Sequence, residues 1–314
     1  MLEYDRLPGE KAVTGARIAA IDFGTNTARL LVAEIGANGF EPVRLEREIV
    51  RMGGGFSREE GLSGDAQERG LRCLERFAAI IRSLGVSRIR AVATSAVRDA
   101  VNGPAFVELI RSRTGIELLV IDGMREGELT LAGVLAGLDR REHELLVFDV
   151  GGGSTEYMLV RDGQARFVRS LPLGVVRLTE GKVTPEAVSE KILRELDLLV
   201  GEMASVSAGP ASGATLVGTA GTATTLAAIA MEMKDYDYRK VNNATISRQQ
   251  IESIYERLLP LSPAERLKTP GLEKGREDLI IAGILLTLHT MDRFGFHTLK
   301  VSDYGLLEGL IVSG

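Results

Sequence analysis

The sequence lacks most of the residues that build disulfides and zinc sites. It has one cysteine, Cys73, and three histidines among 314 residues. A single cysteine excludes an internal disulfide and is typical of a reducing compartment. So few sulfur and imidazole ligands also argue against a zinc site. We therefore expect a cytoplasmic protein without structural disulfides.

Long apolar runs and a strong excess of one charge are also missing. The longest apolar stretch, near residues 280–288, is too short to span a bilayer. The first 15 residues have no apolar core of a signal peptide. The net charge is −5, with 45% hydrophobic and 26% charged residues. We expect no membrane or nucleic-acid partner, and a folded chain of one or two domains.

The sequence does contain two matching glycine turns, each between two apolar, β-rich runs. The first follows Asp22 and reads Gly24-Thr25-Asn26-Thr27, and the second follows Asp149 and reads Gly151-Gly152-Gly153-Ser154-Thr155. Glycine lets the backbone approach a ligand closely, and successive amides in a turn form an anion-binding nest. An ordinary glycine hairpin explains either turn alone. Two of them, each after an aspartate, predict two phosphate-binding loops in a duplicated fold.

The order of expected elements is similar in the two halves. The first half has strands at 17–23, 28–35 and 41–51, a helix at 63–84, a strand at 89–94, a helix at 104–113 and a strand at 117–121. The second has strands at 145–150, 157–161 and 165–170, a helix at 184–203, a strand at 215–218 and a helix at 222–231. Helices at 247–258 and 276–291, a strand at 298–302 and a helix at 303–312 follow. A helix at 125–138 lies between the halves, and residues 1–14 form a loose tail.

Three carboxylates are candidate metal ligands. Asp22 and Asp149 end strands beside the two turns, and Glu156 follows the second turn. Mg²⁺ takes oxygen ligands and is often held by one or two carboxylates together with substrate phosphates. We expect Mg²⁺, or Mn²⁺ in its place, with Asp149 as the preferred ligand and the other two in support. The alternative is that the aspartates cap the turns through their own amides.

Six segments of the chain resemble the Ppx/GppA phosphatase family. They are IDFGTNTARL (21–30), ATSAVRDA (93–100), DVGGGSTE (149–156), SLPLGVVRL (170–178), GTAGTATTL (218–226) and VSDYGLLEG (301–309). The resemblance implies an α/β fold with two ribonuclease H-like domains of the actin, sugar kinase and Hsp70 superfamily and a cleft between them. The first domain is expected at 15–124, completed by a helix at 303–314, and the second at 125–302. This would be a short form, without the helical C-terminal region of longer members.

The resemblance also implies hydrolysis of a terminal phosphoanhydride with magnesium. The family's catalytic glutamate lies in a Gly-x-x-Glu segment before the second loop, which matches Glu126, with Glu128 as a less favoured alternative. We expect Glu126 to orient and partly deprotonate a water. The metal at Asp149 and the two loops would stabilise charge on the terminal phosphate.

Arginines are the remaining candidates for substrate binding, because a guanidinium forks onto phosphate oxygens. Arg29 follows the first loop and Arg98 ends a strand–turn motif, and both are expected to contact substrate. Arg177 and Arg276 lie in or near family-like segments, where a surface ion pair explains them equally well. The resemblance associates positions like Arg29 and Arg276 with alarmone binding.

The leading functional hypothesis is an exopolyphosphatase, which shortens inorganic polyphosphate and releases orthophosphate. A pppGpp 5′-phosphohydrolase is the runner-up, with the same chemistry on a nucleotide. A sugar or acetate kinase of the same superfamily and a non-catalytic alarmone-binding protein are less favoured. The expected partner is polyphosphate, with (p)ppGpp and a homodimer left open.

Overall fold

The computed structural model describes residues 15–37, 39–57, 59–140, 142–180 and 184–313. The chain divides into two compact units, Met1–Asp122 with Leu306–Gly314 (unit 1) and Gly123–Gly305 (unit 2). Each unit contains a mixed sheet, which confirms the predicted α/β class. The tail expected at residues 1–14 lies outside the described residues. Within those residues, no helix is long and apolar enough to cross a membrane.

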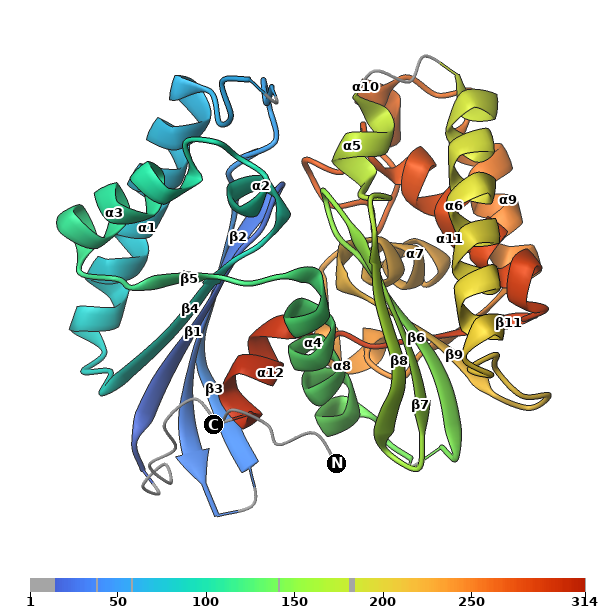
Figure 1. The fold of residues 1–314 in the computed structure, drawn as a ribbon, viewed down its shortest axis with the longest axis horizontal. Coiled ribbons are helices and arrows are strands. Elements are labelled where there is room, and N and C mark those ends of the chain that lie inside the picture. Colours follow the sequence, from blue (N-terminus) through green and yellow to red (C-terminus); the bar gives the residue numbers. More distant parts are fainter. Residues whose placement is uncertain (1–14, 38, 58, 141, 181–183, 314) are drawn as a thin grey trace. The chain divides into compact units, whose positions relative to one another are not determined.

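Unit 1 is a five-stranded sheet with order β3-β2-β1-β4-β5, in which β1 is antiparallel to β2 and parallel to β4. Its elements, labelled in Figure 1, are β1 (Arg17–Phe23), β2 (Thr27–Gly36), β3 (Gly39–Ile49), α1 (Gly64–Ser83), β4 (Arg88–Ala93), α2 (Ser95–Arg98), α3 (Gly103–Thr114), β5 (Leu118–Val120) and α12 (Leu306–Val312). Ser63 caps α1 as predicted, because its side chain accepts a hydrogen bond from the amide of Ala66.

Successive side chains of β1 point to opposite faces of this sheet. Phe23 packs into the core under α1 and α3, where its ring stacks on Phe106 at 5.9 Å between centroids. Ala20 and Asp22 therefore lie on the opposite face. Arg90 stands beside Ala20 in the β1–β4 pairing and donates to the carbonyl of Leu310 at 2.5 Å. Asp22 consequently belongs to the face that α12 covers.

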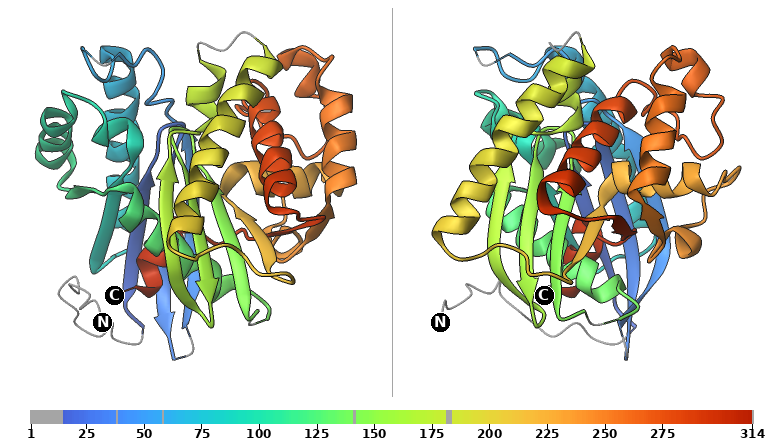
Figure 2. Two further views of the ribbon diagram at one scale, coloured as in Figure 1. Left: turned by 45° about the vertical axis from the view of Figure 1, so that its right-hand side comes forward. Right: turned by 90° about the vertical axis from the view of Figure 1, so that its right-hand side faces the viewer.

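Unit 2 is a six-stranded sheet with order β10-β11-β9-β6-β7-β8. Its elements are α4 (Gly123–Gly137), β6 (Glu144–Val150), β7 (Thr155–Arg161), β8 (Gln164–Leu171), α5 (Val175–Thr179), α6 (Pro185–Ser205), β9 (Thr215–Thr219), α7 (Ala220–Ala230), α8 (Tyr238–Val241), β10 (Thr245–Ser247), α9 (Arg248–Leu258), α10 (Pro263–Arg266), α11 (Ile280–Phe294) and β11 (Thr298–Val301). Figure 2 shows α6 in yellow and α11 in red, which pack side by side.

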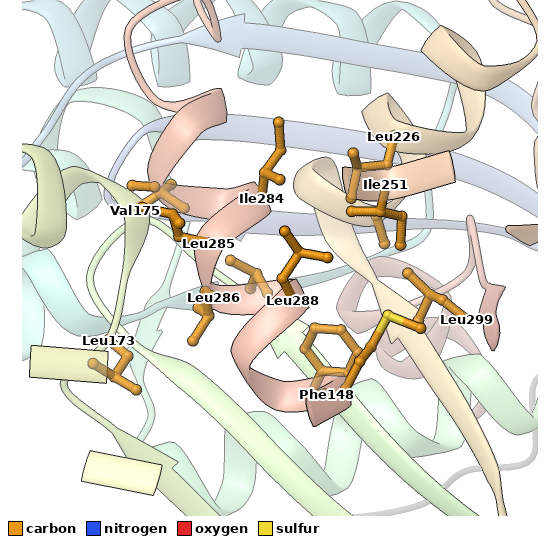
Figure 3. Packing of buried hydrophobic residues seen from close by; sticks show 14 of the residues in the cluster. Phe148, Leu173, Val175, Leu226, Ile251, Ile284, Leu285, Leu286, Leu288 and Leu299 are labelled. Atoms are coloured by element: carbon orange, nitrogen blue, oxygen red, sulfur yellow. The ribbon is translucent and has the colours of Figure 1, made fainter. Parts of the chain in front are cut away.

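The two faces of the second sheet carry separate apolar clusters. Phe148 of β6 joins Leu226, Ile251, Leu286 and Leu299 in the larger cluster, which is formed with α7, α9, α11 and β11 (Figure 3). The smaller cluster, on the other face, contains Leu145, Val147 and Met158 of the sheet with Leu131 and Val134 of α4. Asp149 continues the alternation of residues 145 and 147. It therefore lies on the face that α4 covers.

The strand order confirms the duplication that the matching turns predicted. In unit 2, β8-β7-β6-β9-β11 repeats the order β3-β2-β1-β4-β5 of unit 1, and β10 is added at one edge. Each fifth strand leads into a helix, β5 into α4 and β11 into α12. Helix α4 is part of unit 2, although the strand before it, β5, is part of unit 1. Helix α12 is part of unit 1, although the strand before it, β11, is part of unit 2.

Two helices begin later than the sequence predicted. The helix expected from 276 starts at Ile280, because a tight turn precedes it in which the Arg276 carbonyl accepts from the amides of Leu279 and Ile280, at 3.0 and 2.9 Å. The helix expected from 303 starts at Leu306. There Ser302 and Thr219 both donate to the Tyr304 carbonyl, at 2.8 and 2.9 Å, which holds the segment in a non-helical path.

Candidate active site

Two buried carboxylates face each other in unit 2. Asp149 at the end of β6 is paired in register with Glu156 on β7, and the two side chains are 8% and 1% exposed. Directly opposite residues of an antiparallel pair point to the same face, with their Cβ atoms about 4.5–5.5 Å apart. Two acidic side chains therefore lie close together on the α4 side of the sheet.

A hydroxyl group orients each of these carboxylates. Thr130 of α4 donates to Oδ2 of Asp149 at 3.2 Å, and Ser170 of β8 donates to Oε1 of Glu156 at 2.7 Å. Both hydroxyl groups come from elements that flank the strand pair, α4 above it and β8 beside it. Each carboxylate thus accepts a hydrogen bond from a neighbouring hydroxyl group, which limits its orientation.

Glu126 lies in the first turn of α4, on the stripe of that helix that meets the sheet. Residues three and four apart share a helix face, and three other members of this stripe make sheet contacts. A Cβ at Gly123 would lie 2.3 Å from Cβ of Ser170, and one at Gly127 would lie 2.8 Å from Cγ1 of Val168. Thr130, one turn after Glu126, reaches Asp149. Glu126 is itself 7% exposed, so a third carboxylate is buried on the helix that covers this face of the sheet.

The second glycine loop, residues 151–155, joins these strands. The amide of Gly151 donates to the Ser154 carbonyl at 3.0 Å, which closes the turn. The carbonyls of Gly151 and Gly152 accept from the amides of Val175 and Val176 at the start of α5, at 3.0 and 2.9 Å. In the part of the chain that the structure describes, the amides of Gly152 and Gly153 have no backbone acceptor. The loop thus turns its carbonyls toward α5 and leaves amides for an anion.

The first loop, residues 24–27, has the same construction in unit 1. The amide of Gly24 donates to the Thr27 carbonyl at 3.0 Å, the counterpart of the bond between Gly151 and Ser154. An added Cβ would lie 3.0 Å from that carbonyl in both loops, so each turn needs glycine at its first position. The Thr25 hydroxyl is buried and lies 2.8 Å from the hydroxyl of Ser95, at the start of α2.

The arginines near the first loop are engaged within unit 1. Arg29 stands opposite Asp22 and donates from Nε and Nη2 to its Oδ2, at 3.0 and 2.8 Å. Arg98 donates to the Ile121 carbonyl at 3.0 Å and lies 3.5 Å from Asp99. Both guanidinium groups are half-buried. Protein contacts within unit 1 therefore fix both side chains in place.

The guanidinium of Arg276 lies at the start of α7. A Cβ on Gly221 would come within 2.0 Å of Cζ of Arg276, so the close approach requires glycine there. The Nε of Arg276 pairs with Glu273 at 3.3 Å, and the side chain is mostly buried. Arg177 on α5 donates its amide to the Gly152 carbonyl at 3.3 Å. The structure therefore places Arg276 beside Gly221 and the backbone of Arg177 beside Gly152, both in unit 2.

The comparisons with known proteins agree with this architecture. A model of the Ppx/GppA phosphatase family matches residues 31–314. The chain belongs to the Ppx/GppA phosphatase family. Exopolyphosphatase 2 of Mycobacterium tuberculosis is 32% identical over 315 residues, covering 95% of this chain and 98% of that protein. The bifunctional 3-dehydroquinate synthase/phosphatase of Fusobacterium nucleatum is 30% identical over 308 residues, 94% of this chain, which spans 46% of that longer protein.

Solved structures of Ppx/GppA proteins resemble the chain over nearly its whole length. The Aquifex aeolicus family member is 33% identical with a TM-score of 0.78, covering 95% of this chain and 97% of that one. An exopolyphosphatase from Cytophaga hutchinsonii is 27% identical with a TM-score of 0.86, covering 93% and 96%. These likenesses confirm the predicted family and the two-domain fold of the actin, sugar kinase and Hsp70 superfamily. They also confirm that the chain is a phosphoanhydride hydrolase.

Within this Ppx/GppA protein, the expected metal ligands are divided between the units. Asp149 and Glu156 form one pair in unit 2, whereas Asp22 is paired with Arg29 in unit 1. Among the described residues, no group of three or more His, Cys, Asp or Glu side chains is placed to hold a metal ion. The buried pair of facing carboxylates nevertheless has the oxygen donors that suit Mg²⁺, which commonly takes its other ligands from water and phosphate.

Sequence reasoning missed three hydroxyl residues of this arrangement. Thr130 orients Asp149, Ser170 orients Glu156, and Ser95 is hydrogen-bonded to Thr25. Ser95 and Ser170 lie inside the family-like segments, and Thr130 follows Glu126 by one helical turn. The helical spacing was a usable signal for Thr130. The partner of Ser170 depends on the register of β7 and β8, which the sequence does not reveal.

Proposed function

We propose that the chain is an exopolyphosphatase that hydrolyses the terminal phosphoanhydride of inorganic polyphosphate and releases orthophosphate. The observation that carries this proposal is the facing pair of buried carboxylates, Asp149 and Glu156, on two strands that a glycine loop joins, with the buried Glu126 on the helix that covers the same face. The name of the Mycobacterium tuberculosis relative, which the chain matches over 98% of its length, supports polyphosphate as the substrate.

Glu126 is the proposed general base. A carboxylate that takes a proton from water must lie within hydrogen-bond reach of that water. Glu126 is buried in the first turn of α4, and the facing pair of carboxylates lies on the same side of the sheet. The water would attack the terminal phosphorus in line with the leaving phosphate, as phosphoryl transfer requires.

Asp149 and Glu156 are the proposed holders of Mg²⁺ or Mn²⁺. The residues fit the ion because two buried carboxylates on one face repel each other unless a cation offsets their charge. When bound, such a cation would neutralise charge on the phosphate oxygens. Thr130 and Ser170 would keep both carboxylates aimed at one point, because each donates a hydrogen bond to one of them.

The loops and arginines are the proposed substrate contacts. The amides of Gly152 and Gly153 would donate hydrogen bonds to the terminal phosphate, and the Thr25–Thr27 segment of the first loop offers the same kind of nest. Arg29, Arg98 and Arg276 are the proposed arginine contacts, because a guanidinium binds phosphate oxygens with charge-assisted hydrogen bonds. These groups stabilise charge on a reacting phosphate without covalent chemistry, which is what phosphoanhydride hydrolysis demands.

One experiment tests both the reaction and the base. Orthophosphate release from long polyphosphate, pppGpp and ATP is measured side by side with Mg²⁺, and we expect polyphosphate to have the highest kcat/KM. Glu126→Gln should lower kcat by about 10²–10⁴-fold while polyphosphate still binds.

The matched control is Glu128→Gln, two residues later on the same helix. Glu128 forms an ion pair with Arg125 at 3.1 Å and should be replaceable without loss of turnover. Near-native turnover by Glu126→Gln contradicts the assignment of the base. Preferential hydrolysis of pppGpp instead identifies the nucleotide as the substrate.

A further inference from the structure

A hydrogen bond between two buried hydroxyl groups joins the first glycine loop to α2. The Thr25 hydroxyl group lies 2.8 Å from that of Ser95, and the two residues are 6% and 2% exposed. Ser95 is the first residue of α2, so the bond connects residues that are 70 positions apart in the sequence. The side chain of Thr25 is thus engaged with the protein, and what the loop offers a phosphate at this position is its backbone amide.

Ser95 lies on a closely packed support. Helix α2 begins beside the end of β1, where the Thr94 amide donates to the Phe23 carbonyl at 3.3 Å. Val97 of α2 is buried in the hydrophobic core of unit 1. A Cβ at Gly103, the first residue of α3, would lie 2.2 Å from the Val97 carbonyl oxygen, so the two helices are in close backbone contact. These contacts fix the position of the Ser95 hydroxyl group relative to the sheet.

The backbone of the first loop is held by another segment, the one that follows β3. The Thr25 carbonyl accepts from the amide of Gly53 at 3.1 Å, and the Asn26 carbonyl accepts from those of Val50 and Arg51, at 3.0 and 2.9 Å. Arg51 has a φ of 46°, in the left-handed region, where the chain turns away from β3. Among the described residues, the amides of Thr25 and Asn26 have no backbone acceptor. The loop carbonyls are therefore tied to the protein, and these two amides are left for an anion.

The second loop is held differently at the equivalent position. Thr25 and Gly152 each follow the first glycine of their loop. The Gly152 carbonyl accepts hydrogen bonds from the amides of Val176 and Arg177, at 2.9 and 3.3 Å. Among the backbone hydrogen bonds of the described residues, the Thr25 carbonyl accepts from Gly53 alone. The hydroxyl contact with α2 therefore stands in unit 1 where unit 2 has a second backbone bond.

We infer that Ser95 is a positioning residue for phosphoanhydride hydrolysis. Its hydroxyl group holds the side chain of Thr25, which keeps the amides of Thr25 and Asn26 directed at a phosphate of the substrate. The inference rests on the proposed function, in which this loop contacts polyphosphate. Preorganised amides stabilise a phosphate without having to reorient when it binds, so a loop that loses one of its anchors binds phosphate less tightly.

The test compares variants of the full chain in orthophosphate release from long polyphosphate with Mg²⁺. Ser95→Ala removes the anchor and leaves the buried Thr25 hydroxyl group without this partner, so the urea midpoint should fall. We expect KM to rise at least about tenfold, the size of one charge-assisted hydrogen bond, while kcat stays similar. That split is expected when an interaction made equally in the bound substrate and in the transition state is lost.

A double variant separates the loss of the anchor from the loss of stability. Thr25→Val together with Ser95→Ala removes both hydroxyl groups, so neither stays buried without a partner, and the urea midpoint should return toward that of the native chain. KM should stay as high as in Ser95→Ala. If Ser95→Ala alone fails to fold, the double variant carries the comparison. Thr25→Ser keeps the hydroxyl group and should have a near-native KM.

The matched control is Thr290→Val in unit 2. Thr290 shares another buried hydrogen bond between two hydroxyl groups, which joins it to Tyr157 at 2.7 Å. This variant should lower the urea midpoint, as Ser95→Ala does, and should leave KM unchanged.

Three results overturn the inference: a KM for Ser95→Ala within about twofold of the native value, a KM that recovers in the double variant, or an equal rise in KM for Thr290→Val. If the native chain does not hydrolyse polyphosphate, the proposed function is overturned instead. The same variants are then compared with pppGpp, where the same three results decide the role of Ser95.

Discussion

Asp22 on β1 and Arg29 on β2 stand directly opposite each other, and the guanidinium donates to one carboxylate oxygen at 2.8 and 3.0 Å. At the same place in the duplicated strand pair of unit 2, Glu156 stands opposite Asp149. The same position of the repeat is therefore occupied by an arginine in unit 1 and by a second carboxylate in unit 2. In unit 1 Arg29 offsets the charge of Asp22, whereas in unit 2 the proposed metal ion would offset the charge of the facing carboxylates.

This difference predicts which aspartate the metal needs. Asp149→Asn should raise the Mg²⁺ concentration for half-maximal phosphate release by about 10–100-fold, because it removes half of a two-carboxylate site. Asp22→Asn should leave that concentration nearly unchanged. Direct Mn²⁺ binding to the full chain, followed by electron paramagnetic resonance without substrate, checks the same point independently of activity. Equal weakening of Mn²⁺ binding by the two variants contradicts the prediction.

The hydroxyl of Thr130 predicts a weaker effect of the same kind. Thr130→Val keeps the shape of the side chain but removes the hydrogen bond to Asp149. We expect about a tenfold higher Mg²⁺ requirement with a similar maximal rate, because an orienting partner tunes a ligand rather than replacing it. The matched control is Thr287→Val, which removes a hydrogen bond from another buried threonine to the Gly283 carbonyl of its own helix. An equal change in both variants would mean that the effect is one of packing.

The sequence predicted the strands and the two loops because their signals are local. Continuous apolar runs mark β1 and β6, and each loop is marked by an aspartate before a glycine. Glu126 was predictable from a family-like segment, and its burial follows from the apolar stripe of α4. The neighbours of these residues were harder to predict. Ser170 meets Glu156 only because β7 and β8 pair in one register, and a single-residue slip would turn Ser170 to the other face.

Short elements also escaped prediction. Helices α2 and α5 have only 4 and 5 residues, which is too short for a helical pattern of apolar residues to repeat. Even so, α5 supplies the amides that orient the second loop. The conformation of Arg51 was equally hidden, because arginine carries no sequence signal for a left-handed backbone. Such features depend on tertiary contacts, which override local propensity.

His289 on α11 gives a prediction about pH. Burial lowers the pKa of His289, the nearby Asp292 opposes this effect, and Arg248 adds to it. A group with a folded-state pKa below its unfolded value of about 6.5 binds its proton more readily when the chain unfolds. The native chain should therefore lose stability as the pH falls below about 6.5. His289→Leu, which removes the titrating group, should show a shallower loss of unfolding free energy in urea titrations from pH 8 to pH 5. Parallel curves for the two proteins contradict this expectation.

Gly174 tests whether the shape of the second loop sets activity. A Cβ at Gly174 would lie 2.2 Å from the Gly152 oxygen and 2.3 Å from the carbonyl carbon of Gly153. Backbone atoms cannot rotate away as a flexible side chain does, so Gly174→Ala must displace the loop. We expect kcat/KM to fall by about 10²-fold, because a shift of about 1 Å at a reacting centre has an effect of that size. The unfolding free energy should fall by about 1–3 kcal/mol from overpacking.

Gly201→Ala on α6 is the matched control, since a Cβ there meets nothing within 4 Å. It should keep full activity and gain about 0.5–1 kcal/mol of stability. Full activity in Gly174→Ala would mean that the loop tolerates displacement and that its amides do not position the phosphate.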